Sequence, residues 1–248
     1  MGRNLQSFGV AVLAGLLLIT GCSGGGGEED EAEDLDEDAS GIWTATVTPD
    51  GQAAVNATLI VIPDGDFALT SSEALLIGSG TVNGSAFSAT STGFAPPGGT
   101  FANGAISAPF SLTGTVTTGN ALNGSYSGAN ESGRVAATYN SSVTERQASL
   151  AIVAGSYLVP QQPGAPIVSL AINNGAMTFN VSTGCVGVGD IAVVNPTRNY
   201  YTWTMTFSNC TVINGVYSGL AHMPSNVAVA LLGSSPGNQV PFSLLVVK

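Results

Sequence analysis

The sequence predicts an all-β protein: after a disordered tether come two tandem antiparallel meander β-barrels, each of about eight short strands. Three observations support this fold class. Apolar and polar residues alternate with a period of two, turn-forming pairs recur along the chain, and two halves of the chain share motifs in the same order. Hydrophobic residues make up 44% of the chain and charged residues only 8%, with 33 glycines. This composition suits many short strands joined by tight turns.

The alternation is clearest at residues 201–207, where Tyr201, Trp203 and Phe207 fall on one face and threonines on the other. This pattern is typical of a half-buried antiparallel strand. The aromatic face is expected to be barrel core. An eight-stranded barrel can also hold one small ligand, so these three aromatic residues are the candidate contacts for a small apolar ligand.

Tight turns are indicated by Asn-Gly and Asp-Gly pairs, which favour the positive φ angles of two-residue hairpins. These pairs begin at Asp50, Asp64, Asn83, Asn103, Asn123, Asn174 and Asn214. A short helix is expected only at residues 144–153, between the two halves.

The halves resemble divergent copies of one another, which assigns residues 41–143 to a first barrel-like repeat and 144–248 to a second. The first copy contains extra residues near the Pro- and Gly-rich segment 95–99. The matching segments are 41–43 with 155–157, 59–67 with 170–177, and 122–128 with 213–219.

The N-terminus carries a targeting signal. Residues 8–20 are apolar but too short to span a membrane, and they lead into Ile19-Thr20-Gly21-Cys22,. This ending resembles a bacterial lipobox. The resemblance implies a signal peptide at residues 1–21, a lipid on Cys22 that anchors the chain to the membrane, and, because Ser23 follows, sorting to the outer membrane. Exposure at the cell surface or on the periplasmic face is left open.

Residues 22–40 form the predicted tether, which is rich in glycine and then in acidic residues. Nine of the sixteen acidic residues lie between Glu28 and Asp38. From Gly41 onward there are seven acidic and four basic residues, so the net charge of this part is 4 − 7 = −3. Without a basic face it has no means of neutralising a phosphate backbone, which argues against a nucleic-acid partner.

Two resemblances to known barrels follow from short motifs. Gly41-Ile42-Trp43 resembles the opening of lipocalins and avidins. The cysteine followed by polyglycine, together with residues 126–133 running into Val135-Ala136-Ala137, resembles surface lipoproteins related to transferrin-binding protein B and factor H binding protein. This second resemblance implies a tethered barrel that binds a host protein. The second copy has no counterpart of Glu131.

Cys185 and Cys210 remain as an even pair, and in an oxidising envelope compartment a disulfide between them is expected. A redox or metal role is the alternative. The spacing is not that of a CxxC motif, and the only histidine, His222, has no acidic neighbour in sequence,. No metal and no cofactor are therefore expected.

Candidate catalytic groups have simpler structural explanations. Residues 233–237 fit the pattern GxSxG around Ser235, but a helix does not follow, so a hairpin loop is expected. Asp64 and Asp66 could form the carboxylate pair of a glycosidase, yet they flank a turn glycine. The sequence therefore predicts an outer-membrane lipoprotein that is not an enzyme. Its expected role is binding or structure through a protein partner, and the alternative is carriage of a small apolar ligand.

Overall fold

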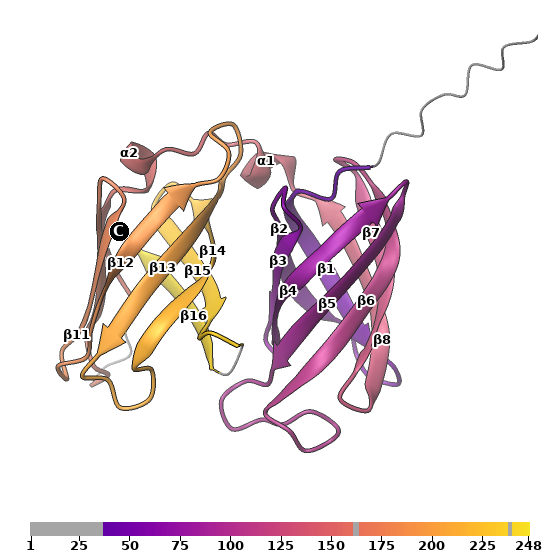
Figure 1. Cartoon of the computed structure of the whole chain (residues 1–248), viewed down its shortest axis with the longest axis horizontal. Coiled ribbons are helices and arrows are strands. Elements are labelled where there is room, and N and C mark those ends of the chain that lie inside the picture. Colours follow the sequence, from indigo (N-terminus) through magenta and orange to yellow (C-terminus); the bar gives the residue numbers. More distant parts are fainter. Residues whose placement is uncertain (1–36, 161–163, 238–239) are drawn as a thin grey trace, which may run out of the picture. The chain divides into compact units, whose positions relative to one another are not determined.

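The computed structural model describes residues 37–160, 164–237 and 240–248. They form two closed antiparallel barrels of eight strands each, which confirms the predicted fold class (Figure 1). Both barrels belong to one compact unit. The predicted signal peptide, Cys22 and the tether up to residue 36 lie outside the described residues.

The first barrel contains β1 (Gly41–Pro49), β2 (Val55–Val61), β3 (Asp66–Ser71), β4 (Leu75–Asn83), β5 (Ala86–Phe94), β6 (Ser107–Thr117), β7 (Ala121–Gly128) and β8 (Glu131–Tyr139). The second contains β9 (Gly155–Leu158), β10 (Val168–Asn173), β11 (Ala176–Val181), β12 (Val186–Val193), β13 (Tyr200–Ser208), β14 (Gly215–Ser225), β15 (Ala228–Ser234) and β16 (Pro241–Val247).

Each barrel is a meander in which every strand pairs with the next strand in sequence. The first barrel closes through a long β1–β8 ladder, in which Trp43 lies opposite Tyr139. The second closes through β9 and β16, where Leu158 lies opposite Val247. Pro160 follows β9 and has no N–H to donate, so it cannot extend this ladder as a donor.

Glycine pairs facing the barrel interior let neighbouring strands approach closely. Gly114 lies opposite Gly124 in the first barrel, and Gly219 lies opposite Gly233 in the second. A Cβ atom added to Gly219 would lie 2.0 Å from the Leu232 carbonyl oxygen and 2.4 Å from the Gly233 Cα. Any larger residue would therefore force the backbone to move.

The first strand of each barrel begins in the same way. The Trp43 indole N–H donates to the Ala39 carbonyl at 3.1 Å, and the Tyr157 hydroxyl donates to the Val153 carbonyl at 2.6 Å. In both cases the aromatic side chain bonds to the residue four positions earlier. The sequence match of residues 41–43 with 155–157 thus corresponds to equivalent strands.

The third sequence match does not join equivalent strands. Residues 122–128 lie mainly in β7, the seventh strand of the first barrel, whereas residues 213–219 enter β14, the sixth strand of the second. The local pattern is the same in both, because each segment is an alternating strand with a tyrosine facing the interior. The sequence match therefore reflects a shared pattern of alternating residues in two strands that hold different places in their barrels.

Two single-turn helices, α1 (Ser141–Thr144) and α2 (Leu150–Val153), occupy the place of the one helix expected at residues 144–153. The Asn140 side chain caps α1 and the Ser149 side chain caps α2. Between them, the Ala148 N–H donates to the Pro196 carbonyl at 3.0 Å. This tertiary bond replaces a helical bond and divides the predicted helix. No helix among the described residues is long and apolar enough to cross a membrane.

A third apolar cluster lies outside both barrel interiors and joins the two barrels. Ile42, Ile60 and Ile62 come from the first barrel, and Tyr200, Leu220 and Leu232 come from the second. Polar contacts add to it: the Arg198 guanidinium donates to the Tyr139 hydroxyl, and Arg146 donates to the Pro224 carbonyl at 3.0 Å. The outer faces of β2 and β14 are therefore partly buried.

Candidate ligand site in the first barrel

A cavity of about 320 Å³ opens at one end of the first barrel. We call this the open end; the β1–β2, β3–β4 and β7–β8 turns and the β5–β6 loop meet there. Inward-facing side chains of the strands form an apolar wall, while the turns form the rim. The wall includes Val47, Leu69, Leu76, Phe110, Leu112, Tyr126 and Val135, and the rim includes Gln52, Glu73, Phe101 and Glu131.

The β5–β6 loop, residues 95–106, places Phe101 over the cavity wall. Phe101 is buried, and its ring packs edge to face on Phe110 with 5.0 Å between the ring centroids. The Phe101 N–H donates to the Ala105 carbonyl at 2.9 Å, and the Gly104 N–H donates to the Phe101 carbonyl at 2.8 Å. This turn holds the aromatic ring inward. The loop contains the extra residues that the sequence places in the first copy only.

Glu131 links this loop to the β7–β8 turn. Burial raises the pKa of the Glu131 carboxyl above the ordinary value, and the nearby Ala102 backbone N–H lowers it by a smaller amount. Burial, with smaller contributions from Glu131 and Asp50, raises the pKa of Tyr126 to about 12. The phenol of Tyr126 is therefore a neutral group beside a carboxylate at neutral pH.

The other end of the first barrel is filled by side chains. The rings of Trp43 and Tyr139 pack edge to face with 5.3 Å between their centroids, and Ala39 is buried beside them. Residues 37–40, which the sequence assigns to the tether, bind to this end. The Glu37 N–H donates to the Gly84 carbonyl at 2.8 Å, and the Asp38 N–H donates to the Thr118 hydroxyl at 2.6 Å.

The candidate ligand contacts of the second barrel all point into its interior, where they belong to a packed core. The ring of Phe242 lies 5.3 Å from that of Trp203 and 5.1 Å from that of Phe207. The Trp203 indole N–H donates to the Leu220 carbonyl at 3.1 Å. Tyr201 is fully buried. Side chains thus occupy the space where the sequence allowed a ligand.

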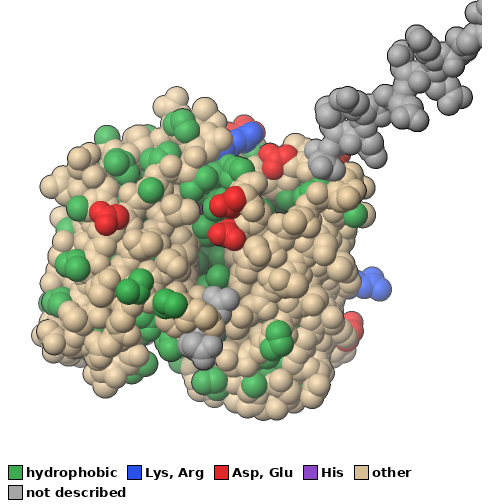
Figure 2. Space-filling view, in the orientation of Figure 1, with side chains coloured by type: hydrophobic (Ala, Val, Ile, Leu, Met, Phe, Trp, Pro, Cys, Tyr) green, Lys and Arg blue, Asp and Glu red, His purple; other side chains and the backbone are tan. Residues whose placement is uncertain are grey.

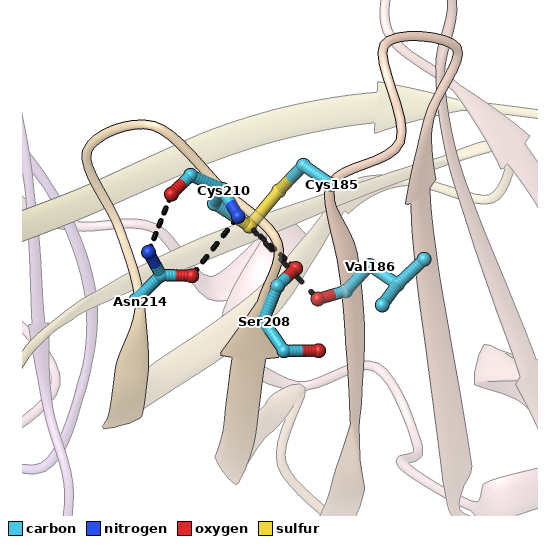
Figure 3. Close-up of a disulfide and its surroundings, with 5 residues drawn as sticks. All are labelled: Cys185, Val186, Ser208, Cys210 and Asn214. Atoms are coloured by element: carbon cyan, nitrogen blue, oxygen red, sulfur yellow. Dashed lines mark hydrogen bonds between the residues drawn. A yellow bond between two sulfur atoms is a disulfide. The ribbon is translucent and has the colours of Figure 1, made fainter.

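The disulfide between Cys185 and Cys210 is present, as predicted, with 4.4 Å between the Cα atoms. It joins the beginning of β12 to the end of β13 (Figure 3). The Asn214 side chain fixes the loop after Cys210, because its amide oxygen accepts from the Cys210 N–H at 2.9 Å and its amide N–H donates to the Cys210 carbonyl. The pair is therefore part of the second barrel's framework.

The candidate catalytic residues Ser235 and Asp64 form hydrogen bonds within turns. Ser235 begins the β15–β16 connection, where its hydroxyl accepts from the Val240 N–H at 2.9 Å, and a strand rather than a helix follows. Asp64 caps the turn before β3 by accepting from the Asp66 N–H at 3.2 Å. Within the described ranges no group of three His, Cys, Asp or Glu side chains could hold a metal ion.

Sequence reasoning missed the cavity of the first barrel. Its residues come from four separate connections, and no local pattern marks Glu73, Phe101 or Glu131 as neighbours. The available signal was the asymmetry between the copies. Only the first copy has the inserted loop and Glu131, and both lie at the cavity.

Comparison with known proteins adds no relative: no family model, no curated protein and no solved structure matches this chain.

Proposed function

We propose that this chain is a lipid-anchored envelope protein, not an enzyme, whose first barrel binds a small and mainly apolar ligand. The observation that carries the proposal is the cavity at the open end. Its volume of about 320 Å³ lies at the lower end of the range typical of small-molecule sites,. The second barrel supports the first through their shared apolar cluster.

The wall of the cavity matches the usual chemistry of such sites, which are mostly apolar with a few polar groups that orient the ligand. Leu69, Leu112 and Val135 supply apolar contact, while Glu131 and Tyr126 supply polarity. The contrast with the second barrel is informative, because there the aromatic rings of Phe179, Phe207 and Phe242 pack against one another. The first barrel thus has a cavity that could hold a ligand, whereas aromatic side chains fill the interior of the second barrel.

Native mass spectrometry of the protein made in a bacterial periplasm tests this function. We expect an additional small-molecule mass that is lost on unfolding. Ala74→Trp should remove it, because Ala74 is half-buried in the cavity lining and the larger ring would block the entrance. Val188→Trp, at an exposed position of the second barrel, is the matched control. If the measured mass is that of the protein alone, both before and after incubation with envelope lipid extract, the proposal is refuted.

A second candidate function, binding to a protein partner, is supported by apolar residues on the outside of the second barrel. Val188 and Val216 are 62% and 49% exposed, and both lie opposite Thr206 in neighbouring strands. The face in Figure 2 also shows few charged side chains among uncharged ones. A photo-crosslinking residue at position 188 should form one discrete adduct on cells, and Val216→Lys should abolish it. Crosslinking that Val216→Lys leaves unchanged would argue against this surface.

A further inference from the structure

We propose that the ligand of the first barrel is an organic cation: an apolar body with a protonated amine or a quaternary ammonium group that lies between the carboxylates of the open end and its aromatic side chains. This inference rests on the proposed function and deepens it by naming the ligand's chemical class.

The charges of the open end are of one sign. Glu73 and Glu131 line the cavity, and no Lys, Arg or His is among its lining residues. Asp50 lies next to them, because its N–H donates to the Ser132 carbonyl at 2.9 Å and its carboxylate accepts from the Ser132 hydroxyl. Arg134 is the base nearest to Glu131 in sequence, and it occupies an exposed position on β8 that faces away from the interior.

Local hydrogen bonds hold the turn that carries Glu73, and the Ser72 hydroxyl donates to the Glu73 carboxylate at 3.1 Å. The Ser71 hydroxyl accepts from the N–H groups of Glu73 and Ala74, each at 3.1 Å, and so fixes the β3–β4 turn. The Glu131 carboxylate lies near the Ala102 N–H. One N–H donor leaves the Glu131 carboxylate with further acceptor capacity, because an ionised carboxylate has about four lone-pair sites. These carboxylates can therefore receive a ligand's N–H groups or its positive charge without rearranging the loops.

Aromatic side chains complete a site suited to a cation. Phe101, Phe110 and Tyr126 all line the cavity, with ring centroids 5.0 Å apart for the two phenylalanines and 6.2 Å apart for Phe110 and Tyr126. Aromatic faces attract ammonium groups through the ring quadrupole, and the attraction is stronger where water is excluded. The apolar wall below them would take the hydrocarbon part of the ligand.

The same arrangement disfavours an anionic ligand such as a fatty acid. A carboxylate in this cavity would lose its hydration, would find no basic partner and would lie near Glu131. A neutral apolar molecule could bind to the apolar wall, but it would leave the rim carboxylates without a positively charged partner. Charge complementarity thus selects the cation.

The test compares three probes of equal chain length: octylammonium, octanol and octanoate. Each is titrated by calorimetry into the full chain held in phosphatidylcholine nanodiscs, with empty nanodiscs as the blank. We expect octylammonium to bind about tenfold more tightly than octanol, and octanoate to bind more weakly than either.

Glu131→Gln is the informative variant, because the amide has nearly the shape of the carboxylate without its charge, and the backbone bonds of Phe101 that hold the loop are unchanged,. Together with Glu73→Gln it should remove the preference for octylammonium and leave the affinity for octanol unchanged. Asp190→Asn, at an exposed position of the second barrel, removes one negative charge and is the net-charge control for Glu131→Gln alone.

The outcomes separate this inference from the function on which it rests. Equal or tighter binding of octanol, tighter binding of octanoate, or an unchanged preference in the double variant would overturn the cation inference while leaving an apolar-ligand site. Binding of none of the three probes would count against both proposals.

Discussion

His222 is the only histidine of the chain, and its side chain is buried on the outer face of β14. Its Nδ1 atom has no hydrogen-bond partner. Burial, with a smaller contribution from Arg146, lowers the pKa of His222 from 6.5 to about 4. At neutral pH the imidazole is thus an uncharged, buried group opposite Tyr200, near the contact between the barrels.

The lowered pKa predicts that His222 weakens the fold in acid. The unfolded chain takes up a proton near pH 6.5 and the folded chain only near pH 4, so stability falls as the pH decreases through this window,. Between pH 7 and pH 5 the loss from this group should be about 2 kcal/mol. Urea unfolding of the wild type and of His222→Leu at both pH values measures it.

The variant should lose less stability on acidification than the wild type, because all carboxyl groups are common to both chains. Identical losses would show that the histidine is not the group responsible.

Single residues also show where sequence reasoning succeeds and fails. The pairing of Cys185 with Cys210 was predictable, because the sequence holds three cysteines and the lipobox resemblance reserves Cys22 for a lipid, which leaves one possible pairing. The proximity of Glu131 to the Ala102 N–H was not predictable, because 29 positions and two strands separate these residues. A loop conformation determines this contact, and no periodic pattern encodes it.

At the level of elements, alternation predicted the interior faces of the strands but not the burial of their outer faces. Leu59, Ile60, Val61 and Ile62 are all buried, although consecutive residues of a strand point to opposite sides,. This uninterrupted apolar run is typical of a strand covered on both faces. It was the visible sign in the sequence that β2 packs against something outside its own barrel.

The disulfide stabilises one element pair, the end of β13 against the beginning of β12. Closing a separation of 25 residues should contribute about 3 kcal/mol through the lost entropy of the unfolded chain,. We expect Cys185→Ala with Cys210→Ala to lower the stability of the second barrel by this amount. Trp203 reports on that barrel and Trp43 on the first, so Trp43→Phe and Trp203→Phe backgrounds separate the two signals.

The control is the same pair of substitutions followed through Trp43. A loss of equal size at Trp43 is expected if the shared apolar cluster makes the barrels unfold as one unit, and a smaller loss at Trp43 would show that they unfold separately. No loss at Trp203 would contradict the assigned role of the disulfide.

At the level of the whole molecule, the apolar cluster between the barrels makes their stabilities interdependent. Leu220 is 5% exposed on the outer face of β14 and packs in a cluster with Ile42 and Ile60. A charge at this position would be buried without a partner. The sequence predicted two barrels, and the apolar run in β2 indicated an outer contact, but nothing in the sequence identified β14 of the second barrel as its partner.

Leu220→Asp should therefore separate the barrels without unfolding either of them. We expect the wild type to unfold in one thermal transition and Leu220→Asp to unfold in two, with a loss of roughly 2 to 4 kcal/mol of stability. Differential scanning calorimetry detects the change. Val216→Asp, on the same face of the same strand but 49% exposed, is the matched control and should keep one transition. One unshifted transition in Leu220→Asp would show that the cluster does not couple the barrels.

The meander order of the strands also determines the order in which the two barrels can fold during synthesis. Every ladder of the first barrel uses strands that end by Tyr139, so this barrel can close while the remainder of the chain is still being made,. Until β13, β14 and β15 form, however, Ile42, Ile60 and Ile62 have nothing to cover them. The newly closed first barrel is therefore expected to expose an apolar surface until the second barrel forms. Folding of the second barrel buries this surface and so protects the chain from aggregation.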